Sequence, residues 1–483
     1  MATMTALKDP NSGKTPEAER RVLVVGLGLS GYWTARHMAQ TGAEVTVSES
    51  RPESELNPDQ VSELKSAGVM LETGEHIKKT FLNADLIVVS PGVPLDILPL
   101  TAAYERHIPV LGEMELASRN IHEPIIAVTG SNGKSTVTYF LGEMLKNSGL
   151  NVFVGGNIGT PLMAYAAKGG GADYLVVEVS SFQLDTIETF HPNISLLLNI
   201  SPDHLDRYRD YPAYIASKLR IFENQGAGDC LILNDEDPVL SGIPTPTGLH
   251  VLRYGPTPNE KRDAFIQEGA IVCGLEEASK RRFSLDHFAL PGIHNRENLM
   301  AAILVGQALQ IPDDIIQTSI DTFRGLPNRL EHVDAFHGVS FFNDSKATNV
   351  DAAMRAVGSF TGNVILIAGG RHKGSDYDLL VETGRDRIKT AVFLGEARAL
   401  LARAFNGAIP FTFAEHMDEA VRKAFEMAQE GDTVLLAPAC SSFDMFSDYA
   451  HRGRAFVRAV QRLKRTTLEQ DDRKRVEAGA VNG

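Results

Sequence analysis

The chain has 483 residues, too many for one ordinary hydrophobic core, and this length predicts two to four domains. Apolar residues make up 43% and charged residues 22%, as in ordinary globular proteins, and no stretch approaches the roughly 18–20 apolar residues of a membrane helix. The formal net charge of −14 argues against nucleic-acid binding, which needs basic surfaces, but it allows a local basic pocket for an anionic small molecule.

The N-terminal segment 1–20 is polar and lacks the apolar stretch of a secretory signal, so we expect a disordered leader on a cytoplasmic protein. The three cysteines, Cys230, Cys273 and Cys440, lie far apart without metal-ligand spacing. This pattern favours a reducing compartment over a disulfide framework or a zinc site.

Short apolar runs alternate with longer amphipathic stretches, which is typical of βαβ units and mainly parallel sheets. In the first block, 21–112, we expect strands at Arg21–Val25, Glu44–Ser48 and Asp85–Ser90 and a helix at Tyr32–Thr41. The second block, 113–325, has expected strands at Pro124–Val128, Tyr174–Glu178 and Ile194–Asn199, and a buried helix at Asn298–Gln310. Its segment 241–282 contains prolines and glycines and predicts loops and short antiparallel strands.

The third block, 326–465, predicts another α/β domain, with a helix at Met417–Gln429 and strands at Val339–Asn343, Asn363–Ala368, Ala391–Leu394 and Thr433–Leu436. Beyond Lys464 the chain is charged and poor in apolar residues, so we expect 466–483 to be a frayed tail. The predicted fold class is therefore α/β, in three domains.

The first glycine motif is Gly26-Leu27-Gly28-Leu29-Ser30-Gly31, which joins an expected strand to a helix. Glycines let the backbone approach a phosphate, and the helix N-terminus offers unpaired N–H groups to it. Glu49 ends the next strand, where a ribose-binding acid stands in dinucleotide-binding proteins. The motif predicts a nucleotide-diphosphate site and on its own suggests NAD or FAD; the alternative is a tight turn that only packs a helix on a sheet.

The second motif, Gly130-Ser131-Asn132-Gly133-Lys134-Ser135-Thr136, again joins a strand to a helix. Its loop amides and Lys134 would surround the β- and γ-phosphates of ATP, and Ser135 would ligate Mg²⁺. Only two residues separate its glycines, whereas the usual P-loop has four. The alternative is a simple helix cap. A third motif, Gly369-Gly370-Arg371-His372-Lys373-Gly374, predicts either a site for an anionic substrate or a solvated loop.

The ATP loop resembles that of the Mur ligases and their folylpolyglutamate synthase relatives. Further blocks follow in the family's order, namely 155–159, 178–184, 199–207, 292–298 and 325–331. Two later blocks, Asn343–Asn349 and Ala439–Asp444, are similar to those of the D-glutamate-adding branch. The resemblance spans 21–463.

This resemblance implies three domains: a Rossmann-like domain for a UDP substrate, a P-loop ATPase-like central domain, and a Rossmann-like C-terminal domain for the amino acid. It implies ATP-dependent joining of D-glutamate to UDP-N-acetylmuramoyl-L-alanine through an acyl phosphate and a tetrahedral intermediate, in peptidoglycan precursor synthesis. ATP would be a co-substrate and Mg²⁺ (or Mn²⁺) would occupy two sites. We expect a monomer with small-molecule substrates and without nucleic-acid or membrane partners.

The resemblance also implies residue roles. The catalytic set is Lys134, Glu178, His204, Lys218 and Lys346. ATP would be bound by the glycine loop Gly130–Thr136 (Gly130, Ser131, Asn132, Gly133, Lys134, Ser135, Thr136) and by Asn295, Asn298, Arg329 and Asp344. The UDP-muramoyl substrate would be bound by Gly28, Leu29, Ser30, Gly31, Glu49, Ser50, Asn157 and Ser180. D-Glutamate would be bound by Thr348, Lys373, Ser442, Phe443 and Tyr449. The metal ligands would be Ser135, Glu178, His204 and, if carbamylated, Lys218.

The residues alone leave other interpretations open. Glu178 could be a solvated strand end, His204 a helix cap, Lys218 a surface lysine and Arg329 a salt bridge at a domain boundary. Tyr449 stands where the family predicts phenylalanine, and Arg371-His372 replaces less basic residues.

Three rival functions remain to be weighed. A folylpolyglutamate synthase-like ligase is disfavoured by the additional first block. An NAD-dependent oxidoreductase would leave Lys134, Glu178 and Lys346 without a role. A nucleotide-binding regulatory protein would have no use for the catalytic set.

Overall fold

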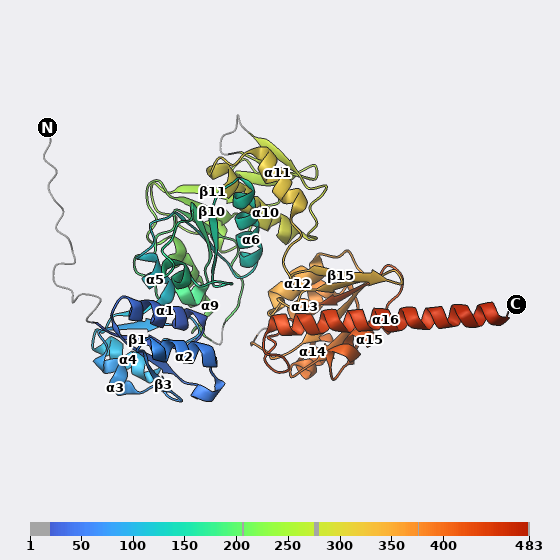
Figure 1. Ribbon diagram of the computed structural model, residues 1–483. Helices are drawn as coiled ribbons and strands as arrows, with labels where there is room; N and C mark the ends of the chain where they lie inside the picture. Colours follow the sequence, from blue (N-terminus) through green and yellow to red (C-terminus); the bar gives the residue numbers. More distant parts are fainter. Residues whose placement is uncertain (1–19, 205–206, 275–279, 375, 482–483) are drawn as a thin grey trace. The chain divides into compact units, whose positions relative to one another are not determined.

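The computed structural model describes residues 20–204, 207–274, 280–374 and 376–481 (Figure 1). The predicted leader therefore lies outside the described residues, apart from Arg20. Within the described chain, no helix is long and apolar enough to cross a membrane.

The chain forms two compact units that do not follow chain order. The first unit holds the chain up to Ala127 together with Leu150–Asn193 and Ser217–Gly226, and the second holds Val128–Gly149, Ile194–Ala216 and the chain from Ala227 onward.

The first block of the sequence forms a five-stranded parallel sheet in the first unit, in the order β3-β2-β1-β4-β5. Its strands are β1 Arg21–Val25, β2 Glu44–Glu49, β3 Met70–Thr73, β4 Leu86–Val89 and β5 Val110–Gly112. The connecting helices are α1 Leu29–Gln40, α2 Pro58–Ser66, α3 Lys78–Asn83 and α4 Leu98–Glu105. The order reverses between β1 and β4, and ligands of open α/β sheets bind beyond the strand ends at such a point.

The second sheet has nine strands in the order β14-β13-β12-β11-β10-β9-β6-β8-β7. Its strands are β6 Ile125–Thr129, β7 Val152–Gly156, β8 Tyr174–Glu178, β9 Ile194–Leu197, β10 Cys230–Asn234, β11 His250–Tyr254, β12 Ala264–Gln267, β13 Ala270–Cys273 and β14 Arg281–Ser284. The helices are α5 Glu113–Ser118, α6 Lys134–Asn147, α7 Leu162–Ala166, α8 Ser181–Leu184, α9 Tyr211–Leu219, α10 Ile293–Ala308 and α11 Asp313–Thr322. Strands β12, β13 and β14 pair antiparallel, as predicted for this segment, whereas β11 joins the parallel part beside β10.

The third sheet has six strands in the order β15-β16-β20-β17-β18-β19, and only β15 runs antiparallel to its neighbour. The strands are β15 Glu331–Phe336, β16 Val339–Asn343, β17 Val364–Gly369, β18 Ile388–Leu394, β19 Phe411–Phe413 and β20 Thr433–Leu436. The helices are α12 Val350–Gly358, α13 Asp378–Gly384, α14 Arg398–Phe405, α15 Met417–Glu426 and α16 Tyr449–Val481.

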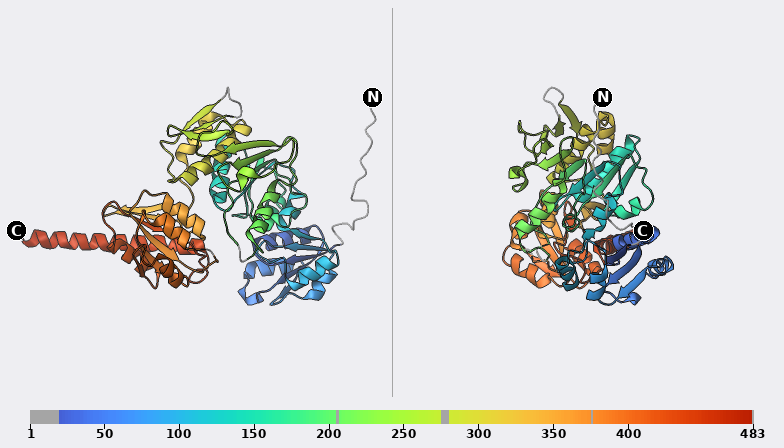
Figure 2. Two further views of the ribbon diagram at one scale, coloured as in Figure 1. Left: turned by 180° about the vertical axis from the view of Figure 1, so that it is seen from behind. Right: turned by 90° about the vertical axis from the view of Figure 1, so that its left-hand side faces the viewer.

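Alternating side chains of β17 divide between the two faces of the third sheet. Val364 and Leu366 pack in the core under α12, α13 and α14, whereas Ile365 and Ile367 pack under α15 and α16. Figures 1 and 2 show these two helical layers on opposite faces of the sheet. Because both faces are covered, the strand is a continuous apolar run, as expected for a buried parallel sheet. The prediction of three α/β sheets is confirmed.

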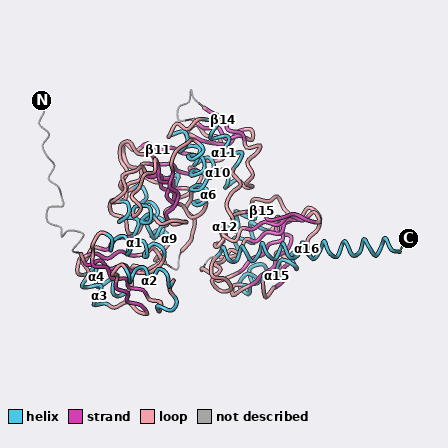
Figure 3. Tube along the Cα trace, viewed as in Figure 1, coloured by secondary structure: helices cyan, strands magenta, loops and turns pink. Residues whose placement is uncertain are grey.

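The charged C-terminal segment differs from the prediction. It is not a frayed tail, because α16 continues through Val481 and runs past the sheet on which it packs (Figure 3). Residues 464–481 contain no proline and many strong helix formers, and a preceding buried turn supplies the nucleus that an isolated helix lacks.

Candidate active site

The second glycine motif forms a tight loop between β6 and α6 in the second unit. Gly133, at φ +87°, is the N-cap residue of α6, and a Cβ there would lie 2.2 Å from the side-chain oxygen of Asn298. The ammonium of Lys134 turns back and donates to the carbonyls of Gly130 and Ser131 at 2.7 and 2.9 Å. The loop thus brings a lysine charge and backbone groups together at a helix N-terminus, which suits a phosphate.

The end of β9 holds this loop in shape. Asn199 accepts the amide N–H of Asn132 at 2.8 Å and donates to its carbonyl at 3.0 Å. The hydroxyl of Ser131 donates to the Ser201 carbonyl at 2.9 Å and also contacts the Tyr214 hydroxyl. The chain segment that follows β9 therefore fixes the shape of the loop. This arrangement goes beyond the simple helix cap that the sequence left open.

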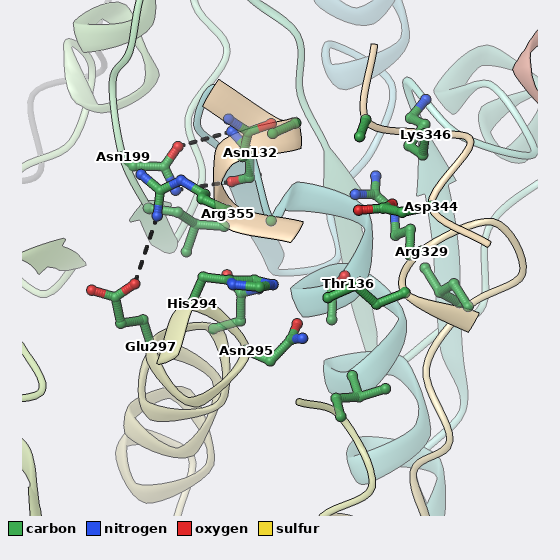
Figure 4. Close-up of a pocket in the computed structure, with 18 of the residues that line it drawn as sticks. Asn132, Thr136, Asn199, His294, Asn295, Glu297, Arg329, Asp344, Lys346 and Arg355 are labelled. Atoms are coloured by element: carbon green, nitrogen blue, oxygen red, sulfur yellow. Dashed lines mark hydrogen bonds and ion pairs between the residues drawn. The ribbon is translucent and has the colours of Figure 1, made fainter. Parts of the chain in front are cut away.

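A cavity opens beside the loop within the second unit (Figure 4). Of the residues predicted to bind ATP or to act on it, those that line it are Asn132, Gly133, Thr136, Asn295, Asn298, Arg329, Asp344 and Lys346. Gly130, Ser131, Lys134 and Ser135 are not among its lining residues. Lys134 is bonded to the loop itself, and Ser135 accepts a hydrogen bond from the Arg329 guanidinium at 2.7 Å.

Several lining residues were not predicted, and the principal polar ones are Asn199, Asn234, His294, Glu297 and Arg355. His294 and Glu297 lie in the same turn of α10 as the predicted Asn295 and Asn298, so helical spacing was a usable signal for them. Arg355 lies on α12, far along the chain, and ion-pairs with Glu297 at 3.8 Å. No local sequence pattern predicted Arg355 as a site residue.

Burial shifts the titration of three acidic and basic groups in this cavity. It raises the pKa of Asp344 to about 7, against the opposing charge of Arg329. It also raises the pKa of Glu297, which Arg355 partly offsets. Burial and the charge of Arg355 lower the pKa of His294 to about 4, so this imidazole is neutral at pH 7. Partial protonation of Asp344 near pH 7 thus lowers the negative charge of the cavity, which suits an ATP site.

Two of the predicted lysines, Lys134 and Lys373, act on the carboxylate of Asp203 in the second unit. Burial raises the pKa of Asp203, but the charges of His204, Lys373 and Lys134 outweigh it and keep the pKa below its usual range. Lys373, from the third glycine motif, therefore lies close enough to Asp203 for its charge to act on the same carboxylate as the charge of Lys134 does. The Nε2 atom of His204 lies 3.7 Å from that carboxylate.

The remaining predicted D-glutamate residues follow β16 and β20. The Lys346 ammonium lies 3.9 Å from the ring centroid of Tyr449. Ser442 is buried, whereas Phe443 is 64% exposed. Thr348 donates its amide N–H to the Lys346 carbonyl at 2.7 Å. The tyrosine that replaces the expected phenylalanine thus contacts a predicted catalytic lysine.

Arg452, a buried arginine on α16, was not among the predicted site residues. Its guanidinium donates to the carbonyls of Ser345, Gly369 and Cys440 at 2.8–3.4 Å. These carbonyls belong to the end of β17 and to the loops after β16 and β20, and the chain segments that follow these strands carry the predicted residues Lys346, Lys373 and Ser442. Arg452 stands four and eight residues before the core residues Phe456 and Val460, and this spacing was a signal that it faces inward.

The first glycine motif lines a second pocket, which belongs to the first unit. Predicted residues that line it are Gly28, Leu29, Ser30, Glu49, Ser50 and Asn157. The loop after β4 (90–94) also lines it, together with Arg51, His76 and Gln183, which were not predicted. The pocket therefore lies at the point where the order of the first sheet reverses, as expected for a nucleotide site.

Two predicted residues do not line this pocket. A Cβ on Gly31 would lie 1.9 Å from the Gly26 carbonyl oxygen, so this glycine serves the close packing of α1 on β1. Ser180 is the N-cap of α8, and with Gln183 it forms a capping box. Gln183, rather than Ser180, reaches the pocket.

Glu49 shapes the glycine turn. Its carboxylate accepts the Leu27 amide N–H at 2.7 Å and pairs with Arg51 at 2.9 Å. Burial opposes ionisation of Glu49, but these bonds lower its pKa to about 2. The carboxylate is thus ionised at pH 7, and its hydrogen bond from the Leu27 amide fixes the glycine turn beside the pocket.

Two further predicted catalytic residues belong to the first unit and are deeply buried. Glu178 and Lys218 are each 2% exposed, which excludes a solvated strand end and a surface lysine. Asn157 donates its side-chain N–H to Glu178 at 2.8 Å. Charged groups are rarely buried to this degree without a partner or a function.

Comparisons with known proteins agree with this arrangement. Three family models match: "Mur ligase MurD-like, N-terminal domain" over residues 20–112, "Mur ligase middle domain" over 128–306, and "Mur ligase, glutamate ligase domain" over 328–440. A UDP-N-acetylmuramoylalanine–D-glutamate ligase from Desulfosudis oleivorans is 47% identical, over 92% of this chain and 97% of its own length. An enzyme of the same name from Koribacter versatilis is 42% identical over 92% and 98%.

Solved structures share the fold at low identity. A pseudomurein peptide ligase type C from Methanothermus fervidus has a TM-score of 0.57 at 18% identity, over 92% of this chain and all of its own. UDP-N-acetylmuramate-alanine ligase from Thermotoga maritima has a TM-score of 0.57 at 17% identity, over 92% and 99%. With the family-model matches and the close relatives, these findings establish that the chain belongs to the Mur ligase family.

Proposed function

We propose that this chain uses ATP to join D-glutamate to UDP-N-acetylmuramoyl-L-alanine in peptidoglycan precursor synthesis, as a cytoplasmic monomer. One observation carries the proposal: a glycine loop with Lys134 stands beside a cavity that is also lined by Arg329, Asp344 and Lys346. The 47% identical relative that carries this enzyme name supports the choice of substrates.

The reaction must bring two anions together, because the substrate carboxylate attacks the γ-phosphate of ATP. At about 4 Å their repulsion is roughly 4 kcal/mol at an effective dielectric constant near 20. Lys134, Arg329 and Lys346 supply opposing charge. Lys134 is bonded to two loop carbonyls, so phosphate oxygens would take over these contacts when ATP binds.

Mg²⁺ fits the available donors. Ser135 and Glu178 offer a hydroxyl and a carboxylate oxygen, which Mg²⁺ prefers, while His204 and a carbamylated Lys218 would hold the second ion. Among the described residues, no group of three or more His, Cys, Asp or Glu side chains forms a complete metal site. Phosphate oxygens would complete the coordination, as is usual for Mg²⁺. When bound, the ions would neutralise phosphate charge.

In the amide-forming half of the reaction, the amine of D-glutamate attacks the acyl carbon and phosphate leaves from the tetrahedral intermediate. D-Glutamate brings two carboxylates, for which Lys373, Ser442 and Thr348 offer a cation and hydroxyl donors. Lys346, which lies beside Tyr449, would meet the negative charge that develops.

The test measures phosphate release from ATP while UDP-N-acetylmuramoyl-L-alanine and D-glutamate are omitted in turn. We expect release only with both substrates and none with L-glutamate. Release with a folate and L-glutamate would instead assign the folylpolyglutamate branch, and release with neither pair would refute the proposal.

A matched pair of lysine variants of α6 refines this test. Lys134→Ala should lower kcat by about 100-fold or more, the usual effect of removing one transition-state charge contact. Lys146→Ala, on the exposed last turn of the same helix, should leave turnover unchanged. Equal activity of the two variants would remove Lys134 from the mechanism.

A further inference from the structure

Arg452 is a buried cation in the third domain. It lies on α16 and is 2% exposed. Burial lowers the pKa of Arg452 to about 10, so the guanidinium stays charged at pH 7. Among the described residues, no ion pair joins this guanidinium to a carboxylate. A buried charge without an ionic partner is costly, so stability alone does not account for Arg452.

Carbonyl oxygens and one hydroxyl surround the guanidinium instead. Nη2 donates to the Ser345 carbonyl at 2.8 Å, and Nε donates to the Ser345 hydroxyl at 3.0 Å. Nη1 donates to the carbonyls of Cys440 and Ser441 at 3.1 and 3.3 Å, and to the Gly369 carbonyl at 3.4 Å. These groups lie at or beyond the carboxyl ends of β16, β20 and β17, which are neighbours in the sheet and parallel. Arg452 thus joins the ends of three adjacent strands.

The third glycine motif leaves room for this contact. Gly370 has φ +136°, and a Cβ there would lie 2.1 Å from the Ser441 carbonyl oxygen and 3.1 Å from Nη1 of Arg452. The backbones of Arg371 and Ser441 exchange two hydrogen bonds, at 2.9 and 3.1 Å. A side chain at position 370 would push these segments apart, so the glycine keeps the motif close to the guanidinium. The motif therefore takes part in the arrangement around Arg452 and does not only carry Lys373.

Ser345 extends the arrangement to Lys346 and Tyr449. Its hydroxyl, which accepts from Nε of Arg452, donates to the Tyr449 carbonyl at 2.8 Å. Tyr449 is the first residue of α16, and the centroid of its ring lies 3.9 Å from the Lys346 ammonium. Arg452 and Ser345 therefore fix the backbone on both sides of this contact between lysine and tyrosine.

Each segment that Arg452 holds carries residues of the proposed D-glutamate site. The segment after β16 carries Lys346 and Thr348, the segment after β17 carries Lys373, and the segment after β20 carries Ser442. The site must accept two carboxylates, whereas carbonyl oxygens carry the negative ends of the peptide dipoles. The charge of Arg452 neutralises the carbonyl oxygens that it bonds, and it adds positive charge beneath the segments.

We propose that Arg452 is a positioning residue for D-glutamate. It holds the three segments so that Lys346, Thr348 and Ser442 converge on the amino acid, and its charge offsets the two carboxylates of that substrate. Arg452 is buried and donates its hydrogen bonds within the chain, so it acts through these residues and does not touch the substrate. The inference rests on the proposed function, because it takes these residues as the D-glutamate site.

The proposal predicts an effect on one substrate. Arg452→Met removes the charge and the hydrogen bonds but keeps an unbranched side chain. Its KM for D-glutamate should rise by about tenfold to 100-fold, because a displacement of site residues by about 1 Å has effects of this size. The KM for UDP-N-acetylmuramoyl-L-alanine should change by less than about twofold, because uniform binding of that substrate is not altered. Partial unfolding would instead lower kcat and leave both KM values unchanged.

Two further variants separate charge from geometry. Arg452→Lys keeps the positive charge but offers one nitrogen in place of three, so it cannot bond all three segments. We expect its KM for D-glutamate to lie between the values of the wild type and Arg452→Met. Arg458→Met removes an exposed charge from the same helix and should leave the KM for D-glutamate unchanged.

Ser345→Ala tests the proposal if the variants of Arg452 do not fold. It leaves the guanidinium in place and removes only the hydroxyl that links it to the Tyr449 carbonyl. Its KM for D-glutamate should rise by about fivefold, the equivalent of one hydrogen bond of ordinary strength. The KM for the UDP substrate should again stay unchanged.

Phosphate release from ATP by the full chain, with each substrate varied in turn, gives these constants, and unfolding midpoints show which variants fold. An unchanged KM for D-glutamate in folded Arg452→Met, or in Ser345→Ala if the arginine variants do not fold, would overturn the proposal. An equal rise of both KM values would also overturn it, because it would mark a general loss of structure. Wild-type protein that releases no phosphate with D-glutamate would instead refute the proposed function and this inference with it.

Discussion

At the scale of the residue, burial separates functional candidates from their ordinary interpretations. Lys218 was indistinguishable by sequence from a surface lysine on a helix, and the structure places it 2% exposed. A lysine ammonium is costly to bury, and carbamylation would convert it into an anion that suits a metal site. Its burial favours the chemical role that the family resemblance implies.

We expect Lys218→Ala to lose activity by about 100-fold or more, as for removal of a group that acts in the transition state. A short carboxylic acid should restore part of this loss, because it can replace the carbamate in the space that the side chain leaves. The activity of Lys168→Ala, a variant at an exposed lysine of the same unit, should not change when the acid is added. Absence of rescue, in a variant with a normal unfolding midpoint, would contradict carbamylation.

At the scale of the element, α16 combines two roles along one helix. Its first turns bury Arg452, Phe456 and Val460 against the third sheet, and Lys464 pairs with Asp334 at 2.8 Å. The backbone beyond this point remains helical. The buried part thus holds three segments of the candidate site through Arg452.

We expect deletion after Glu469 to change the free energy of unfolding of the third domain by less than about 0.5 kcal/mol, with normal phosphate release. Phe456→Ala should cost about 3–5 kcal/mol, because it leaves a cavity between α16 and the sheet. Denaturant titration of both variants checks this contrast. A large loss in the truncated chain would assign a structural role to the last turns.

At the scale of the whole molecule, two buried carboxyls set a pH dependence of stability. Glu113 and Asp344 each have a pKa raised to about 7 by burial. Between the carboxyl pKa of the unfolded chain, about 4, and this raised value, the folded state binds more protons than the unfolded state. The contribution of these two carboxyls to stability should therefore fall as pH rises from about 4 to about 7.

Glu113 alone contributes at most about 3.4 kcal/mol to this fall, because burial raises its pKa from 4.5 to about 7. Unfolding midpoints of the wild type and of the double variant Glu113→Gln, Asp344→Asn test the prediction. The double variant should have the flatter profile over this range. Equal slopes would mean that neither carboxyl holds its proton in the folded state.

Much of the fold and of the candidate site could be predicted from sequence because the signals are local. Strand β1 was predicted with its observed bounds, since an apolar run before a glycine turn is readable within ten residues. The two glycine motifs likewise identified the turns that line the two pockets. The prediction of a frayed tail was wrong. Low apolar content argues against packing, but it does not by itself argue against a helix that continues from a packed turn.

The sequence by itself determined the α/β class, the glycine turns and the kind of anion each would meet, because these depend on residues that are neighbours in the chain. Only the tertiary structure decided which side chains share a site. Arg355 meets Glu297, Arg452 contacts three separate chain segments, and Glu113 accepts the Met163 amide N–H across 50 positions of the chain. Such contacts depend on how strands are ordered in a sheet. Burial governs the charge state of these side chains, and it exists only once the layers have packed.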